Sequence, residues 1–192
     1  MKEKKRKVAD IAMSLFIENG VQHTSVQEII DRANISKGTF YNYFSSKTDC
    51  VASILENLRY DAGQRRIEMQ MGRDKRDRDV FIEQISILIQ LNEERNLHAL
   101  FESIMSSNEN ELKKLVLQHR IYEIEWIAMR LTEIIGEAVR PYSMELTVLF
   151  NGMLQHILFT NRITNAAYSP QKVVRSLYAY VELIAARMIE TG

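Results

Sequence analysis

Apolar residues recur at helical spacing along most of this chain. In the first segment, residues that fall three or four positions apart are apolar, at Val8, Ile11, Ala12, Leu15 and Phe16. The same spacing predicts further helices near 79–95, 96–107, 109–138, 142–165 and 170–190. The 192 residues include only 2 prolines and 7 glycines, and the turn-rich pattern of β proteins is absent. The sequence therefore predicts an all-α protein.

Capping residues divide the first part of the chain into four helices, of which the second and third are short. Gly20 is expected to end the first helix, since glycine readily adopts the left-handed conformation that follows a helix. Two overlapping capping boxes, Thr24 with Gln27 and Ser25 with Glu28, are expected to start the second. Further caps and stops are expected at Ser36, at Ser46 with Asp49, and at Gly72.

The segment NISKGTFYNYFSSK, residues 34–47, follows the second helix after a tight turn. This order is typical of a helix-turn-helix, whose second helix enters the major groove of DNA. If the third helix starts at Lys37, Phe40 and Phe44 lie on one face and pack inward. Lys37, Gly38, Tyr41 and Asn42 then fall on other faces, where they are free to contact a partner.

The outward side chains of this segment have the chemistry that DNA requires. Lys37 can donate to guanine O6 or N7, and Gly38 lets the backbone approach base edges. Tyr41 and Asn42 can donate to phosphates, as can Lys47 at the start of the fourth helix. Ser25 and Thr24 at the start of the second helix could do the same. The alternative is that these residues are ordinary caps and surface groups, an interpretation that we favour for Thr24, Ser25 and Ser36.

The stretch SLFIENGVQHTSVQEIIDRANISKGTFYNYFSSKTDCV resembles the N-terminal domain of the tetracycline-repressor (TetR) family of bacterial transcription regulators. The resemblance covers about the first quarter of the chain. It implies that Lys37 and Gly38 approach bases and that Thr39, Tyr41, Asn42 and Lys47 approach phosphates. It also implies a DNA-binding domain at 1–47 and an effector-binding and dimerisation domain at 48–192, joined by a long fourth helix. The chain departs from the family at Asn42, often a second tyrosine, and at Tyr43, often a histidine.

The segment 109–138 is apolar on two sides. One side carries a stripe with alternating spacings of four and three, which predicts a buried face: Leu117, Ile121, Ile124, Ala128, Leu131 and Ile135. The other side carries Leu115, His119, Tyr122, Trp126 and Met129. Such a helix is either covered on both sides or lines a cavity. The family implies a small-molecule effector, for which the candidate residues are Trp126, Tyr122, His119, Met129, Phe101, Met105 and Phe150.

The two C-terminal segments, 142–165 and 170–190, are also strongly apolar. In the family, two such helices meet those of a second copy and form a four-helix interface. The resemblance therefore implies a homodimer, and the alternative is that both segments belong to an intramolecular core. A dimer suits DNA binding, because two recognition helices about 34–36 Å apart read successive major grooves.

Several other classes of protein are not expected. The histidines (His23, His98, His119 and His156) and Cys50 lack the spacing of metal ligands, and no Gly-rich phosphate loop or nucleophile elbow occurs. Neither an enzyme nor a metal or cofactor is expected. No apolar run approaches the roughly 20 residues of a membrane span, the start lacks a signal peptide's apolar region, and a single cysteine fits a reducing, cytoplasmic location.

The sequence thus predicts a ligand-responsive DNA-binding regulator, a repressor that binds a palindromic operator and is released by an effector. The formal net charge is +0, but basic residues crowd the first ten positions and the segment 34–47. Two alternatives stay open. One is a ligand-independent architectural DNA-binding protein, and the other is a helical carrier or enzyme.

Overall fold

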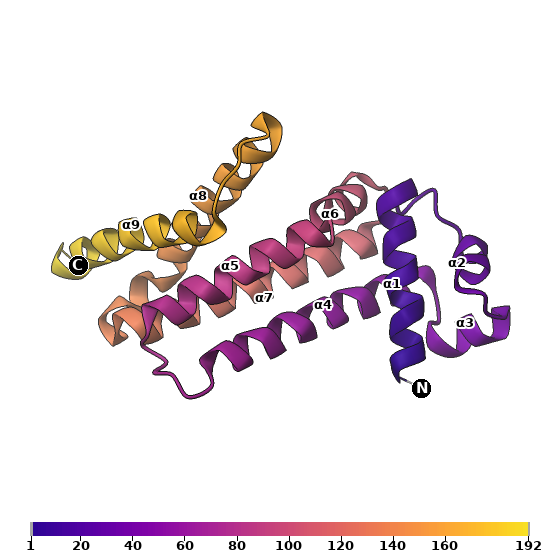
Figure 1. Ribbon diagram of the computed structural model, residues 1–192, viewed down its shortest axis with the longest axis horizontal. Coiled ribbons are helices and arrows are strands. Elements are labelled where there is room, and N and C mark those ends of the chain that lie inside the picture. The colour runs from indigo at the N-terminus through magenta and orange to yellow at the C-terminus, as the bar shows by residue number, and fades with distance from the viewer. Residues whose placement is uncertain (1, 192) are drawn as a thin grey trace. The chain divides into compact units, whose positions relative to one another are not determined.

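The computed structural model describes residues 2–191, and in this part of the chain every regular element is a helix (Figure 1). The prediction of an all-α protein is confirmed. The α-helices are α1 Lys2–Asn19, α2 Val26–Ala33, α3 Lys37–Tyr43, α4 Lys47–Gln70, α5 Arg78–Glu94, α6 Leu97–Ser106, α7 Asn110–Ile135, α8 Ser143–Thr164 and α9 Pro170–Thr191. A short 3-10 helix, η1 Glu137–Tyr142, precedes α8.

The predicted caps hold, with one exception. Ser36 Oγ accepts the backbone N–H of Thr39 at 3.1 Å, and Ser46 Oγ accepts that of Asp49 at 3.0 Å. Of the two overlapping boxes before α2, Ser25 with Glu28 forms, with bonds of 3.1 and 2.6 Å. Thr24 does not cap α2, because its buried hydroxyl donates to backbone carbonyls of the preceding segment instead.

The seventh helix ends earlier than its apolar pattern predicts. α7 stops at Ile135 instead of 138, and Gly136 follows it with a φ of +116°. Residues with a Cβ are strained at this φ, whereas glycine adopts it freely. The helix therefore ends where Gly136 takes this conformation. Residues 137–142 then form η1, which contains Pro141.

The chain divides into two compact units that interleave along the sequence. Unit 1 runs to Gly63 and includes Asn92–Arg120, whereas unit 2 consists of Gln64–Leu91 and the residues from Ile121 onward. Three helices, α4, α5 and α7, contribute residues to both units. The bounds of these units differ from those of the predicted functional domains, 1–47 and 48–192. The division into a DNA-binding and an effector-binding domain therefore stays a prediction.

Unit 1 has a core built around α1. Its fully buried side chains include Phe16, Ile29, Phe40, Phe44 and Leu100. The sequence-based assignment of Phe40 and Phe44 to the interior is confirmed, since both are 0% exposed. The core of unit 2 is aromatic, with the Phe81 ring centre 5.7 Å from that of Phe150 and 5.9 Å from that of Tyr178.

The predicted buried stripe of α7 was partly wrong. Leu117 and Ile121 are 47% and 53% exposed, whereas Ala128 and Leu131 are buried as predicted. In the first half of α7 the buried residues are Leu112 and Val116 instead, so the buried line there runs along a neighbouring face of the helix. When a helix is apolar on two sides, its periodicity does not indicate which side packs against the rest of the chain.

Candidate nucleic-acid interface

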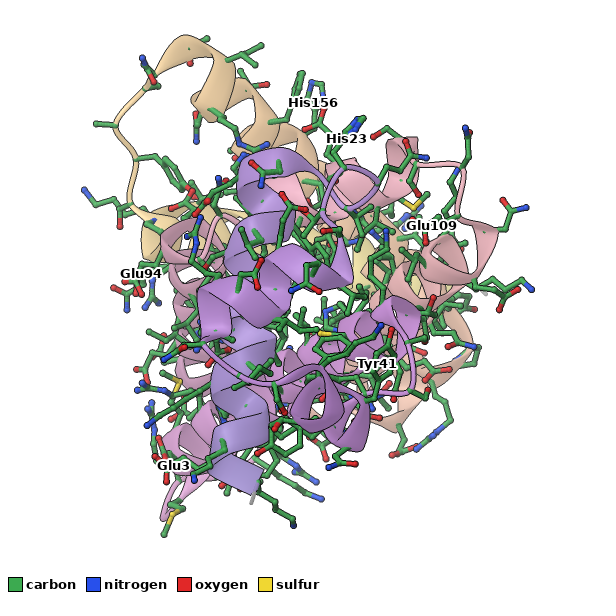
Figure 2. All side chains as sticks on the ribbon, turned by 90° about the vertical axis from the view of Figure 1, so that its right-hand side faces the viewer. Glu3, His23, Tyr41, Glu94, Glu109 and His156 are labelled. Atoms are coloured by element: carbon green, nitrogen blue, oxygen red, sulfur yellow. The ribbon has the colours of Figure 1, made fainter. Side chains whose placement is uncertain are left out.

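The third helix is fixed from beneath by two phenylalanines. The ring centres of Phe40 and Phe44 lie 5.3 Å apart inside the core of unit 1. Tyr41, which is labelled in Figure 2, is 48% exposed. Its ring meets that of Phe40 edge to face, with ring centres 5.5 Å apart. The ammonium of Lys5 on α1 lies 5.1 Å from the centre of the Phe44 ring, a distance that allows a cation–π contact. α3 is therefore a short helix with a buried inner side and an exposed outer side.

The turn between α2 and α3 has the geometry of a helix-turn-helix. Asn34 ends α2 in the left-handed conformation with a φ of +49°, which asparagine tolerates better than most residues. Its backbone N–H donates to the Asp31 carbonyl at 3.2 Å, and that of Ile35 donates to the Ile30 carbonyl at 3.2 Å. Ser36 then caps α3, so three residues suffice to reverse the chain between the two helices.

The outer side of α3 presents the predicted base-contacting and phosphate-contacting groups. Lys37, Gly38 and Asn42 are exposed, and Thr39 is half-buried with its hydroxyl 2.9 Å from Ser36 Oγ. A Cβ added at Gly38 would meet only Ser36 Oγ, at an ordinary 3.8 Å. Glycine costs a helix about 1 kcal/mol relative to alanine, and no contact described for this chain requires it here. Its small size therefore suits close approach by a partner.

Three predicted DNA-contacting residues are engaged within the chain. Thr24 is 1% exposed, with its hydroxyl 3.2 Å from the Leu15 carbonyl and 2.9 Å from the Gly20 carbonyl. Ser25 is exposed but occupied as the cap of α2. Lys47 Nζ donates to the Val21 carbonyl at 2.8 Å and pairs with Glu109 at 3.1 Å. The structure thus brings Lys37, Gly38, Tyr41 and Asn42 to one exposed helix and turns Thr24 inward.

Sequence reasoning missed the residues that hold this helix-turn-helix in unit 1. Ser103 on α6 accepts the backbone N–H of Val21 at 2.8 Å. Asp61 on α4 pairs with both Arg6, at 2.6 Å, and Arg95, at 3.1 Å. The Asp61 carboxylate raises the pKa of Arg6 above its ordinary value, mainly through this hydrogen bond. These partners lie far apart in the sequence, so no local pattern could have indicated them.

The predicted effector-binding residues do not gather in one unit. His119, Phe101 and Met105 belong to unit 1, where the rings of Phe101 and His119 lie 5.6 Å apart. Tyr122, Trp126, Met129 and Phe150 belong to unit 2. Phe150 is fully buried, and Trp126 stacks on Phe81 with ring centres 6.3 Å apart. Met129 lines a surface hollow of about 370 Å³ together with residues that include Ala128, Thr132, Arg140 and Ser143.

A polar cluster centred on Arg66 lies beside Trp126 in unit 2. The Arg66 guanidinium lies 3.6 Å from the centre of the Trp126 ring and pairs with Glu123. Gln84, 2% exposed, donates its side-chain N–H to the Arg66 carbonyl at 2.8 Å. Three buried atoms of this region, Arg66 Nε, Gln84 Oε1 and Gln70 Oε1, have no hydrogen-bond partner within the chain. Buried polar atoms are nearly always hydrogen-bonded in proteins, so these three atoms are candidates for contact with a polar ligand or water.

Other site types find no support among the described residues. Within residues 2–191 there is no group of three His, Cys, Asp or Glu side chains placed to hold a metal ion. Cys50 is fully buried, and burial raises the pKa of its thiol to about 12. None of the helices in this same range combines the length and the apolar character needed to cross a membrane.

Comparison with known proteins agrees with this geometry. Residues 9–54 match the model of the family described as bacterial regulatory proteins, tetR family. The chain is 32% identical over 158 residues to YuxN of Bacillus subtilis, an HTH-type transcriptional regulator, an alignment that covers 81% of this chain. The same alignment covers 54% of YuxN, so the chain spans about half the length of that relative.

Solved structures share the fold. A transcriptional regulator from Aquifex aeolicus superposes with a TM-score of 0.67 at 22% identity, over 94% of this chain and 99% of the other. The flavonoid-responsive regulator FrrA superposes with a TM-score of 0.65 at 21% identity, over 94% and 96% of the two chains. The likeness therefore extends through both units.

Proposed function

The chain belongs to the TetR family of bacterial regulatory proteins, and we propose that it is a ligand-responsive repressor that binds a palindromic operator as a homodimer. The single observation that carries the DNA-binding part is the division of α3 into two sides. Phe40 and Phe44 are buried, while Lys37, Gly38, Tyr41 and Asn42 are outward. In this proposal residues 1–47 bind DNA and residues 48–192 bind the effector and dimerise. The protein acts in the cytoplasm.

Each outward residue has a distinct proposed role. Lys37 reads a guanine edge, and Gly38 permits the close approach of the helix backbone to the bases. Tyr41, Asn42 and Thr39 donate to phosphates, and Ser25 adds its hydroxyl at the start of α2. Thr24 makes no DNA contact in this proposal, because its side chain is buried and its backbone N–H donates to the Gly20 carbonyl. Lys47 contacts a phosphate from the first turn of α4.

A binding titration tests the DNA site. The probe is a duplex that the wild-type protein selects from a random-sequence pool. Lys37→Ala should weaken binding to this duplex and relax the preference for one base pair, at a cost of about 1–3 kcal/mol. Tyr41→Phe, which removes only a phosphate donor, should weaken binding to all duplexes alike. Unchanged affinity in both variants would remove α3 as the DNA contact.

The effector site proposed here is the cluster around Trp126. Its support is the set of buried polar atoms without partners beside an aromatic wall. Tyr122 and Met129 lie on the same helix, and Phe150 belongs to the aromatic core that continues the wall. FrrA, which shares the fold, is flavonoid-responsive, so the fold is compatible with ligand control. We give His119, Phe101 and Met105 a lesser place, since they belong to the other unit.

An effector acts by binding one conformer of the protein better than the other. Screening planar polar compounds by their effect on the operator complex tests this part of the proposal. An active compound should release the duplex from the wild-type protein and not from Trp126→Ala. A compound that releases both equally would place the effector site elsewhere.

The proposed dimer interface is formed by α8 and α9. Large apolar side chains are exposed on these helices: Met144, Val148, Leu149, Phe159, Ile163, Tyr180, Leu183 and Ile189. Gly152 lies in the middle of the α8 set, and a Cβ added there would meet nothing within 4 Å. A glycine inside a helix is destabilising unless something must approach closely, and a helix of a second copy would do so. Exposed apolar area of this kind marks a protein–protein contact.

A further inference from the structure

The proposed phosphate contact Lys47 is already held by an acid. Lys47 is the first residue of α4, and its Nζ donates to the Val21 carbonyl at 2.8 Å. The same Nζ lies 3.1 Å from a carboxylate oxygen of Glu109. The Lys47 side chain is 22% exposed, so both contacts are partly shielded from water. A phosphate that approaches Lys47 therefore meets an ammonium whose charge is neutralised within unit 1.

Glu109 is placed by the connection between α6 and α7. It precedes Asn110, the first residue of α7, and its backbone N–H donates to Ser107 Oγ at 3.2 Å. Ser107 is 1% exposed, and its hydroxyl donates to the Ile104 carbonyl at 2.7 Å. The backbone of Glu109 is thus braced, while its side chain is 33% exposed. A carboxylate released at this position remains beside the N-terminus of a helix, where negative charge is stabilised.

We propose that Glu109 competes with a DNA phosphate for Lys47, so that operator binding exchanges one anion for another. This inference rests on the proposed DNA-binding function. An ammonium has three donors, and the uncharged Val21 carbonyl occupies one of them in either state. This bond keeps Nζ in place while the carboxylate leaves and a phosphate oxygen takes its position. Glu109 thereby lowers the affinity for DNA.

The exchange also couples the DNA site to another part of unit 1. Before binding, the Lys47–Glu109 pair joins the start of α4 to the start of α7. DNA binding breaks this ion pair, so any change that strengthens the ion pair lowers the affinity for DNA. The coupling is reciprocal, since a free energy between two sites acts equally in both directions. The α6–α7 connection is therefore a place where a change of conformation alters operator affinity.

Glu109→Gln tests the competition directly. The amide retains an acceptor for Lys47 and removes the negative charge. The affinity for the selected duplex should increase by up to about fivefold, the range of a partly exposed ion pair. Glu111→Gln is the matched control, because Glu111 lies two residues further on, in the first turn of α7, is exposed, and pairs with Lys114 at 2.7 Å instead. It should leave the affinity unchanged.

The increase in DNA affinity caused by Glu109→Gln must depend on Lys47. In a Lys47→Met background Glu109→Gln should have no effect, whereas in a Lys47→Arg background the gain should persist. Lys47→Met alone should also reduce the slope of log affinity against log salt by about 0.9 for each copy, since one phosphate contact is lost. Thermal melting of each variant verifies that it is folded, and the Glu109→Gln comparison stands without the Lys47 variants.

Two results overturn the inference while the proposed function survives. One is a Glu109→Gln affinity equal to or weaker than that of wild type, with Lys37→Ala still impairing binding. The contacts of Lys47 with Val21 and Glu109 would then have a purely structural role. The other is a gain that persists in Lys47→Met, which would make it a general effect of charge. If the wild-type protein binds no duplex at low salt, the proposed function fails and this inference fails with it.

Discussion

The guanidinium carbon of Arg66 lies 3.6 Å from the centre of the Trp126 ring, within the core region of unit 2. The side chain of Arg66 is 5% exposed, and its ion-pair partner Glu123 is 27% exposed. A buried pair of this kind contributes little net stability compared with apolar residues of the same shape. Stability therefore does not explain why α4 carries an arginine here, which supports a role for the cluster in binding a ligand.

Removing the partner of Arg66 should be costly. Glu123→Gln leaves a buried guanidinium without its counter-ion, and we expect a loss of about 2 kcal/mol in the free energy of unfolding. Urea titration measures it. Glu137→Gln is the matched control, because Glu137 pairs with Arg140 on the surface, and this change should leave the free energy of unfolding nearly unchanged. Equal effects of both substitutions would show that water reaches Arg66 freely.

The phenylalanines beneath α3 should dominate the stability of the helix-turn-helix. Phe40→Ala removes a fully buried ring and should destabilise the protein by about 3–5 kcal/mol. Tyr41→Ala removes a ring that is 48% exposed and touches Phe40 at its edge, so about 1 kcal/mol is expected. Denaturant unfolding followed by circular dichroism separates the two. Similar losses in both variants would mean that Phe40 is not part of a packed core.

The elements that could be predicted from the sequence are those whose signal is local. Ser25, Ser36 and Ser46 each cap a helix because the donor that they accept lies three residues ahead. The inward direction of Phe40 and Phe44 follows from their spacing of four in a helix. These local signals sufficed for the fold class and for the division of α3 into an inner and an outer side.

The intramolecular contacts of the candidate site residues depend on tertiary packing and could not be predicted. Thr24 and Ser25 are adjacent and equally suited to capping, and only the packing of the segment before α2 turns Thr24 inward. Lys47 and Glu109 meet across unit 1 although neither lies in a pattern that points to the other. On α7, Leu117 and Ile121 are as apolar as Leu112, and the sequence does not say which the chain itself covers.

The thiol of Cys50 should be unreactive in the folded protein. Burial raises its pKa from 9.0 to about 12, so the nucleophilic thiolate is scarce at pH 8. A thiol reagent should label native protein very slowly and urea-unfolded protein completely. The folded state holds the proton more tightly, so unfolding releases it between pH 9 and pH 12. This contribution to stability is complete below pH 9 and is lost as the pH rises to about 12. Rapid labelling of the native protein would contradict the buried position.

A charge on the exposed apolar face of α9 should separate the proposed dimer. Leu183 is 70% exposed in the single chain, and Leu183→Glu would place a carboxylate in the interface, where it has no partner. We expect light scattering after size-exclusion chromatography to give a dimer for wild type and a monomer for this variant. Operator affinity should fall with it, because one recognition helix alone makes few contacts.

The control for this change is Met71→Glu, which adds the same charge at a residue that is 73% exposed and lies outside α8 and α9. It should leave the dimer intact.

Gly152→Ala adds a sharper test, since alanine strengthens an isolated helix by roughly 0.5–1 kcal/mol. If a second copy packs closely at Gly152, the added methyl group weakens the dimer even as it favours the helix. A dimer that tolerates both Leu183→Glu and Gly152→Ala would place the interface on another surface.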